Sequence, residues 1–170
     1  MSSARSLRWI WLSLAIVAAD RASKAAVEIF TPEGYRHALV RNFVYLVHAQ
    51  NPGIAFGIFS DSPPKWLLGL LVAGSLAVIG ALAWLLVTGH AGGKLSQAGV
   101  ALILGGAAGN VTDRLLHGGV TDFFEMLLGS YHWPAFNVAD SAITIGAALV
   151  VLELFFGARG TAGEPESRKA

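Results

Sequence analysis

The segment FNVADSAITIGAALVVLELFF, residues 136–156, decides how the rest of the chain is interpreted. It is long and apolar enough to cross a bilayer, which takes about 20 residues, yet Asp140 lies near its start. The first turn of a helix leaves backbone N–H groups unpaired, and the helix dipole favours an anion there. A carboxylate is therefore tolerated at this position. A helix cap as its only role is one interpretation, and it gives no reason for choosing an aspartate.

The whole chain has the composition of a membrane protein. Of its 170 residues, 54% are hydrophobic and 14% are charged, whereas soluble domains have roughly 25% charged residues. The mean hydropathy is +0.57. A net charge of +1 gives no broad basic surface, so we expect no nucleic-acid partner. The absence of cysteine excludes disulfides, thiolate catalysis and Cys-ligated metal.

Three further segments approach the length of a membrane span. Residues 66–87 are uninterrupted, whereas residues 7–27 and 95–116 contain polar side chains. We therefore expect one integral membrane domain, residues 1–170, with an α-helical fold of four transmembrane helices (7–27, 66–87, 95–116 and 136–156).

A cleaved signal peptide is the alternative for the first segment. Arg5 and Arg8 precede it, and VAAD (17–20) loosely resembles a cleavage site. Because apolar residues continue as far as Phe30, we favour a helix that is retained in the membrane.

The distribution of basic residues predicts the orientation of the helices. If four helices alternate, one side receives Arg5, Arg8, Lys94 and the basic residues after the last helix, namely Arg159, Arg168 and Lys169. Both termini are then expected in the cytoplasm. Arg36, Arg41 and Lys65 fall on the other side and weaken this bias. The tail, about 158–170, has the composition of a disordered segment.

The two connections on the outer side of the membrane differ in character. Residues 29–65 contain NFVYLVHAQN (42–51), which is rich in β-branched and aromatic residues and predicts a strand. NPGIAFGIF (51–59) follows, with turn residues before an apolar patch. We expect a small β-sheet lying on the membrane surface, and a loop or short helix, between the first and second helices. Residues 117–134 contain aromatic side chains that suit the membrane interface.

Polar residues inside the hydrophobic segments are functional candidates, because such residues are costly in lipid. Asp20 and Lys24 have the i,i+4 spacing of a helical ion pair, and an ordinary interfacial pair is the simpler interpretation. The segment GGAAGNVTDR (105–114) has glycines that allow close helix packing, followed by Asn110, Asp113 and Arg114. Asn110 lies on the same helical face as Asp113 and Arg114. The alternative is that Asp113 and Arg114 simply end the helix in the lipid headgroups.

Asp122 and Asp140 form a candidate catalytic pair, although their spacing alone leaves their meeting open. Two close carboxylates share a proton, so one can take a proton from water while the other donates to a carbonyl. This chemistry hydrolyses peptides without a metal or cofactor. The chain has no HExxH motif, and its five histidines lack metal-ligand spacing. A Ser23–Lys24 dyad is disfavoured because adjacent helical residues point in different directions.

Five blocks of sequence resemble the lipoprotein signal peptidase family, the bacterial signal peptidase II family. They occur in order between the hydrophobic segments: DRASK (20–24), NPGIAFG (51–57), GGAAGNVTDR (105–114), GVTDFF (119–124) and FNVADS (136–141). Each block alone is weak, but five in this order are specific, and the resemblance covers the chain apart from its two tails.

The resemblance implies an intramembrane aspartic endopeptidase of the bacterial cytoplasmic (inner) membrane. The outer connections and their small β-sheet would then be periplasmic, with the active site near the periplasmic face. Such an enzyme cleaves diacylglyceryl-modified prolipoproteins on the N-terminal side of the lipidated cysteine, with no cofactor or metal. It implies Asp122 and Asp140 as the catalytic pair that activates water and polarises the scissile carbonyl. Residues that it implies shape the site and position the substrate are Asp20, Lys24, Asn51, Gly53, Asn110, Asp113, Arg114 and Asn137. The expected partners are prolipoprotein signal peptides and membrane lipids, and the chain is expected to be a monomer.

Two other functions are compatible with the polar residues. A proton- or ion-coupled transporter also places carboxylates in membrane helices, though nearer the midplane and commonly with internal repeats. An assembly protein would use them only to lock helices together.

One block departs from the pattern that is commoner in the family. Pro52 and Ile54 stand where Thr and Ala are commoner, and Pro52 removes a backbone donor from the turn. We expect residues 51–59 to cover the site as a lid.

Overall fold

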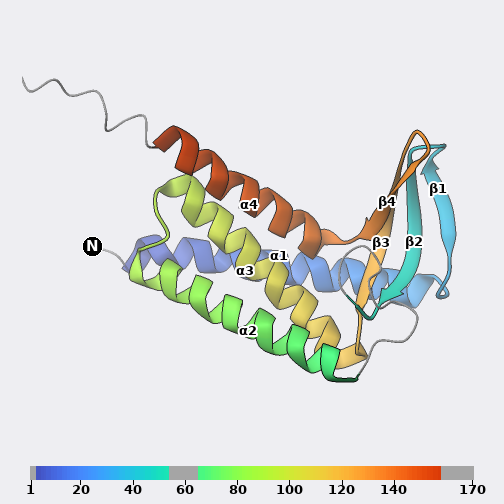
Figure 1. Cartoon of the computed structure of the whole chain (residues 1–170), viewed down its shortest axis with the longest axis horizontal. Coiled ribbons are helices and arrows are strands. Elements are labelled where there is room, and N and C mark those ends of the chain that lie inside the picture. The colour runs from blue at the N-terminus through green and yellow to red at the C-terminus, as the bar shows by residue number, and fades with distance from the viewer. Residues whose placement is uncertain (1–2, 54–64, 158–170) are drawn as a thin grey trace, which may run out of the picture.

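The structure, a computed structural model, describes residues 3–53 and 65–157. Four helices lie side by side, and a sheet stands across one end of them (Figure 1). The helices are α1 (Ser3–Phe30), α2 (Lys65–Thr88), α3 (Lys94–His117) and α4 (Val138–Gly157). The predicted tail, and the predicted lid beyond Gly53, lie outside the described residues.

Helix α3 is the centre of the bundle and contacts the other three helices. Its glycines allow this. A Cβ atom at Gly105 would lie 2.7 Å from the carbonyl oxygen of Ser13 in α1. A Cβ atom at Gly99 would lie 2.5 Å from the carbonyl oxygen of Gly146 in α4. The close helix packing predicted from the glycine-rich segment is therefore present.

The outer faces of the bundle are apolar. Large exposed side chains follow α2 and α4, for example Trp66, Leu70, Trp84, Ile145 and Leu154. Within the described residues, two helical segments are long and apolar enough to span a membrane, namely Trp66–Thr88 and Val138–Phe156. Helices α1 and α3 are at least as long as α2 and α4, but polar side chains interrupt them. Most of these polar side chains point into the bundle, as the burial of Ser13, Asp20 and Asn110 shows.

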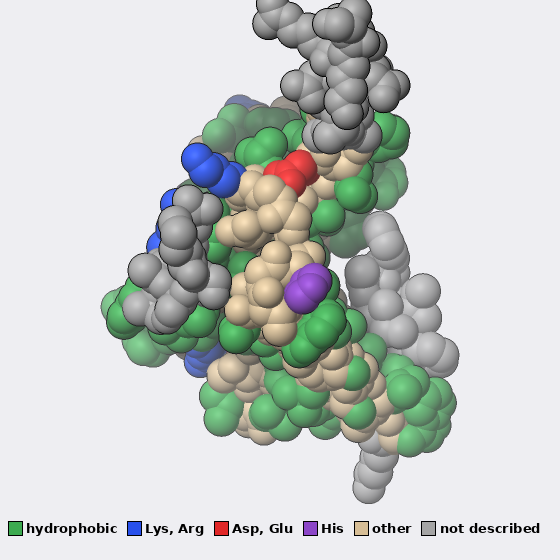
Figure 2. Space-filling view, turned by 90° about the vertical axis from the view of Figure 1, so that its left-hand side faces the viewer, with side chains coloured by type: hydrophobic (Ala, Val, Ile, Leu, Met, Phe, Trp, Pro, Cys, Tyr) green, Lys and Arg blue, Asp and Glu red, His purple; other side chains and the backbone are tan. Residues whose placement is uncertain are grey.

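The end of the bundle away from the sheet is closed by contacts between the α2–α3 loop and α4. The carboxylate of Glu153 accepts hydrogen bonds from the N–H groups of Gly93 and Ser96, which are otherwise unpaired at the start of α3. Figure 2 shows this end of the molecule, where hydrophobic side chains form much of the rim and Lys and Arg side chains lie at one edge.

The sheet is antiparallel, with strands in the order β1 (Arg36–Val40), β2 (Val44–Asn51), β3 (Val120–Leu128) and β4 (Tyr131–Phe136). The predicted strand at 42–51 is confirmed as β2. The prediction was incomplete, because the second connection supplies β3 and β4. Buried residues run consecutively at the start of β3 rather than alternating, so the period-2 signal of a strand is missing there. Helix α4 accordingly begins at Val138, because Phe136 still belongs to β4.

Replacement of Gly146 by alanine should destabilise the protein by about 1–3 kcal/mol, because the new methyl group meets the backbone of α3. The matched control is Gly74→Ala in α2, where a Cβ atom meets nothing within 4 Å. That change should be neutral or stabilise by up to about 1 kcal/mol through helix propensity. Thermal unfolding in detergent measures both. Equal melting temperatures for the two variants would contradict the close packing of α3 on α4.

Candidate active site

A cavity of about 560 Å³ lies where the sheet meets the ends of α3 and α4. Asp122 of β3 and Asp140 of α4 both line it, together with Asn110 and Arg114 of α3 and Asn51 of β2. Its other walls are largely apolar, from β4 and from Ile143 and Thr144 of α4. The cavity therefore combines two carboxylates with an apolar surround, as ligand sites commonly do.

Asp122 is buried, with 3% of its surface exposed. Its Oδ1 accepts a hydrogen bond from Asn137 Nδ2 at 2.8 Å, and its Oδ2 accepts one from Asn51 Nδ2 at 3.2 Å. Burial, and then the charge of Asp140, raise the pKa of Asp122 to about 7 despite these two donors. Asp122 can therefore hold a proton near neutral pH.

Asp140 forms a reciprocal cap at the start of α4. Its Oδ2 accepts from the N–H of Asn137 at 3.2 Å, and its own N–H donates to Asn137 Oδ1 at 2.9 Å. A third donor, Asn110 Nδ2, reaches Asp140 Oδ1 at 2.8 Å. Asp140 thus caps the helix and lines the cavity at the same time, so capping does not account for all of its contacts.

Asn137 connects the two aspartates. Its backbone N–H contacts Asp140, while its side-chain amide donates to Asp122 and lies 3.3 Å from the carbonyl oxygen of Thr121. Asn137 has no exposed surface. Asp122 and Asp140, which are 18 residues apart in the chain, are therefore linked through the buried residue Asn137.

A buried ion cluster, defined here as Asp20, Arg21, Lys24 and Asp113, lies behind the cavity rather than in its wall. Lys24 Nζ is 2.8 Å from Asp20 Oδ2 and 2.9 Å from Asp113 Oδ2, and all three side chains are fully buried. Arg21 pairs with the other oxygen of Asp113. The pair predicted at positions 20 and 24 is therefore internal and not an interfacial ion pair.

Arg114 lies in the cavity, but its hydrogen bonds go to backbone carbonyls. Nη2 donates to the carbonyl of Gly53 at 3.3 Å and Nη1 to that of Asn110 at 3.4 Å. Nε is buried and has no hydrogen-bond partner among the described residues. Gly53 in turn donates its N–H to Asn51 Oδ1 at 3.1 Å. This turn uses the N–H of residue 53, so the donor that Pro52 lacks is not needed there.

Two residues that sequence reasoning did not single out contact Asp113, and one of them, Thr121, connects the buried ion cluster to the sheet. Thr121 has no exposed surface; its N–H donates to Asp113 Oδ2 at 3.2 Å and its hydroxyl to Glu28 at 2.8 Å. Arg21 neutralises Asp113 from α1. Both lie inside blocks quoted above, next to Asp122 and Asp20, and only their position beside those residues could have drawn attention to them.

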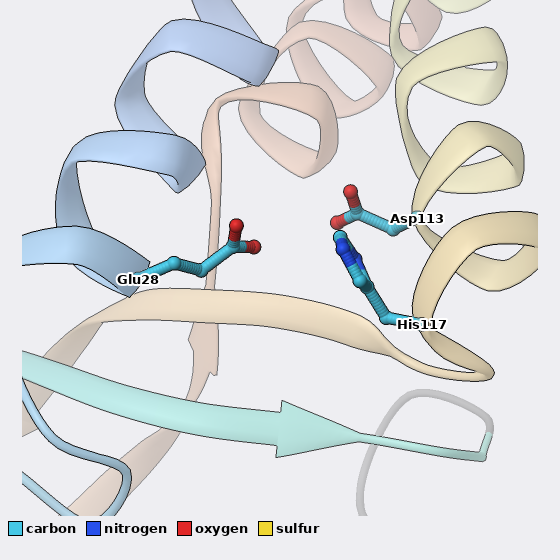
Figure 3. A group of neighbouring side chains, drawn as sticks. All are labelled: Glu28, Asp113 and His117. Carbon is cyan, nitrogen blue, oxygen red and sulfur yellow. The ribbon is translucent and has the colours of Figure 1, made fainter.

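Glu28, Asp113 and His117 form a group whose ligand atoms all lie within 4.8 Å of one another. Figure 3 shows the three side chains, which come from α1 and α3 and point toward one another. Asp113 already accepts from Arg21, Lys24 and the N–H of Thr121, and Glu28 accepts from the Thr121 hydroxyl. A divalent cation would have to compete with the buried Lys24 and the partly buried Arg21, so we assign no metal to this group.

Comparisons with known proteins agree over almost the whole chain. A family model described as signal peptidase (SPase) II matches residues 12–156. A lipoprotein signal peptidase of Vibrio cholerae serotype O1 is 41% identical over 150 residues, covering 88% of this chain and 87% of that protein. One from Burkholderia vietnamiensis is 42% identical over 155 residues, covering 90% of each. A solved structure described as a bacterial membrane enzyme, 25% identical, superposes with a TM-score of 0.76 over 96% of this chain.

The helical fold with its small sheet is thus that of a bacterial membrane enzyme. The chain belongs to the signal peptidase II family, the lipoprotein signal peptidases. It is therefore a peptidase of lipoprotein processing and acts on lipoprotein precursors.

The raised pKa of Asp122 predicts how stability depends on pH. The pKa rises from 3.8 to about 7 on folding, so the folded state binds the proton more tightly. This stabilisation is complete below pH 3.8 and is lost as the pH rises through about 7. Between pH 5 and 8 the free energy of unfolding should therefore decrease by an amount on the order of a few kcal/mol. The melting temperature should fall with it. In Asp122→Asn the fall should be much smaller.

Glu125→Gln, on the same strand, is the control for this measurement. In the wild type the pKa of Glu125 is lowered, chiefly by the hydrogen bond from Arg36. The stability that the Glu125 carboxylate contributes is therefore lost only as the pH falls toward its folded-state pKa. This variant should keep the wild-type slope between pH 5 and 8. An unchanged slope in Asp122→Asn would show that Asp122 is not the group that binds the proton.

Proposed function

We propose that the chain is an aspartic endopeptidase that cleaves diacylglyceryl-modified prolipoproteins on the N-terminal side of the lipidated cysteine. Asp122 and Asp140 are its catalytic pair. The observation that carries the proposal is the cavity in which both carboxylates contact Asn137, with Asp122 buried and its pKa raised to about 7. Family membership supports the substrate class, and the geometry supports the aspartic mechanism.

The proposed reaction uses one proton that the pair shares. Ionised Asp140 removes a proton from a water molecule, whose oxygen attacks the scissile carbonyl carbon. Protonated Asp122 donates its proton to the carbonyl oxygen, which gives a neutral tetrahedral diol. The amide nitrogen then takes a proton from Asp140 while Asp122 recovers its proton from a diol hydroxyl. The C–N bond breaks, which leaves a carboxyl product and a free amine on the lipidated cysteine.

The polar residues around the pair support this assignment. Asn51, Asn110 and Asn137 present neutral N–H donors to the carboxylates, which orients both without fixing both as anions. Arg114 has a buried Nε that makes no hydrogen bond to a described residue. We assign it to a backbone carbonyl of the bound substrate, since its planar guanidinium suits such an acceptor.

We further propose that the four helices cross the inner membrane with the cavity near the periplasmic face and both termini in the cytoplasm. The sheet stands at one end of the bundle (Figure 1), and its exposed Leu39, Phe43, Tyr131 and Trp133 suit the lipid interface. Exposed Arg8 and Lys94 lie toward the other end, consistent with a cytoplasmic location. A substrate helix in lipid would approach along α4, past Ile143 and Thr144.

Substitution of either catalytic aspartate should abolish cleavage. Purified Asp122→Asn and Asp140→Asn should each lose at least about a thousandfold in kcat toward a diacylglyceryl-modified prolipoprotein, because neither amide can exchange the proton. EDTA should leave the wild type active. Cleavage is followed by the change in mass of the lipoprotein, with circular dichroism as a check of folding.

The control for the aspartate variants is Glu125→Gln, which removes a carboxylate from the same strand on the side that pairs with Arg36. It should retain wild-type activity. Substantial cleavage by either folded aspartate variant would remove that residue from catalysis, as expected if the polar residues only lock the helices together.

The membrane orientation can be tested because the chain contains no cysteine. A cysteine at Ser130, in the β3–β4 turn, should react with a membrane-impermeant maleimide in spheroplasts. A cysteine at His90, in the exposed α2–α3 loop, should react only after the membrane is permeabilised. The reverse pattern would invert the proposed topology, and labelling of both sites in intact spheroplasts would place both ends of α3 on the outside.

A further inference from the structure

Lys24 is a fully buried lysine whose ammonium group has three acceptors. Two are the carboxylates of Asp20 and Asp113, at 2.8 and 2.9 Å, and the third is Asn110 Oδ1 at 3.0 Å. An ammonium group has three N–H donors, so this environment satisfies all of them. The third bond is unusual because it goes to a neutral amide that also contacts the catalytic pair.

The contact with Lys24 determines which way the amide of Asn110 points. An ammonium group can only donate, so the atom that faces it must be the amide oxygen. Asn137 Nδ2, at 3.4 Å, is a second donor toward the same oxygen. The amide nitrogen must then face Asp140, and it lies 2.8 Å from Asp140 Oδ1. A flipped amide would set two oxygens against each other and leave an ammonium N–H unsatisfied.

The other two asparagines of the site are oriented in the same way, but by the backbone. Asn51 Oδ1 accepts from the N–H of Gly53, and Asn137 Oδ1 accepts from the N–H of Asp140. Each nitrogen is therefore left to donate to Asp122. Asn110 is the exception, because its orientation depends chiefly on a side chain in another helix.

We propose that Lys24 is a positioning residue of the catalytic site, which fixes the amide of Asn110 so that its N–H is presented to Asp140. The proposal rests on the assignment of Asp140 to catalysis. Lys24 does not line the cavity. Of its three acceptors, Asn110 is the one whose side chain also hydrogen-bonds to a member of the catalytic pair. Loss of Lys24 should leave the Asn110 amide free to turn and should weaken the orientation of Asp140 toward water, with little effect on substrate binding.

A double-mutant cycle tests the proposal. Lys24→Met and Asn110→Ala should each lower kcat by roughly 10- to 100-fold with KM changed by less than about threefold. The double variant should be no slower than Asn110→Ala within about threefold, because the side-chain hydrogen bonds that join Lys24 to Asp140 run through Asn110. Multiplicative losses would overturn the proposal, as would a kcat within about threefold of wild type in either folded single variant.

Arg21→Met is the matched control. It also removes one positive charge from the buried ion cluster and breaks an ion pair to Asp113, but it leaves the contact between Lys24 and Asn110 in place. Its kcat should stay within about threefold of wild type even where its melting temperature falls. A loss of kcat equal to that of Lys24→Met would show that the charge of the cluster, and not the amide contact, is what matters.

Should Lys24→Met not fold, the pair Asp20→Asn/Lys24→Met takes its place in the cycle. The pair preserves the net charge of the cluster, and Asn at position 20 retains an oxygen for the N–H of Ala139. Asp140→Asn in the same assay keeps the two proposals apart. If Asp140→Asn cleaves substrate, the proposed catalytic pair is wrong. The coupling between positions 24 and 110 is measured by the double-mutant cycle and does not depend on that result.

Discussion

The carboxylate of Asp113 is the point at which the helices and the sheet are joined. It accepts from Lys24 and Arg21 of α1 and from the N–H of Thr121 in β3, and it belongs to α3 itself. Burying such charges costs nearly as much free energy as their attraction returns, whereas removing one partner costs about 3–5 kcal/mol. The cluster therefore contributes geometry more than net stability. It fixes β3 against α1 and α3, and the next residue of β3 is Asp122.

This polar centre depends on the close packing of the helices. A Cβ atom at Gly109 would lie 2.5 Å from Asp20 Oδ2, so only glycine lets Asp20 lie against α3. From there Asp20 Oδ1 accepts from the N–H of Ala139 at 3.0 Å, in the first turn of α4. One aspartate of α1 thus fixes the start of the helix that presents Asp140. The glycines that bring the helices together and the residues that orient the catalytic pair are parts of one arrangement.

The sequence predicted those parts of the fold and site that depend on neighbouring residues in the chain. The i,i+4 spacing of Asp20 and Lys24 indicated their contact, and hydrophobicity located α2 and α4 to within two residues. Strand β3 was not predicted, since its register depends on pairing with β2, whose partner residues lie 69 to 82 positions away, and its buried run does not alternate. The roles of Arg21 and Thr121 were invisible for the same reason, because their partners lie more than 90 residues away or on other elements.

An aspartic mechanism also constrains where positive charge can lie. A cation directly beside both carboxylates would favour ionisation of both and remove the shared proton. Lys24 is paired with Asp20 and Asp113, and its hydrogen bond toward the pair goes to the neutral amide of Asn110. Arg114 lines the same cavity, but its hydrogen bonds to described residues go to the backbone carbonyls of Gly53 and Asn110 and not to either carboxylate. Burial of Asp122 can then dominate, so its pKa remains raised. Lys24 therefore orients the pair through the amide of Asn110, while its charge lowers the pKa of Asp122 by less than burial and Asp140 raise it.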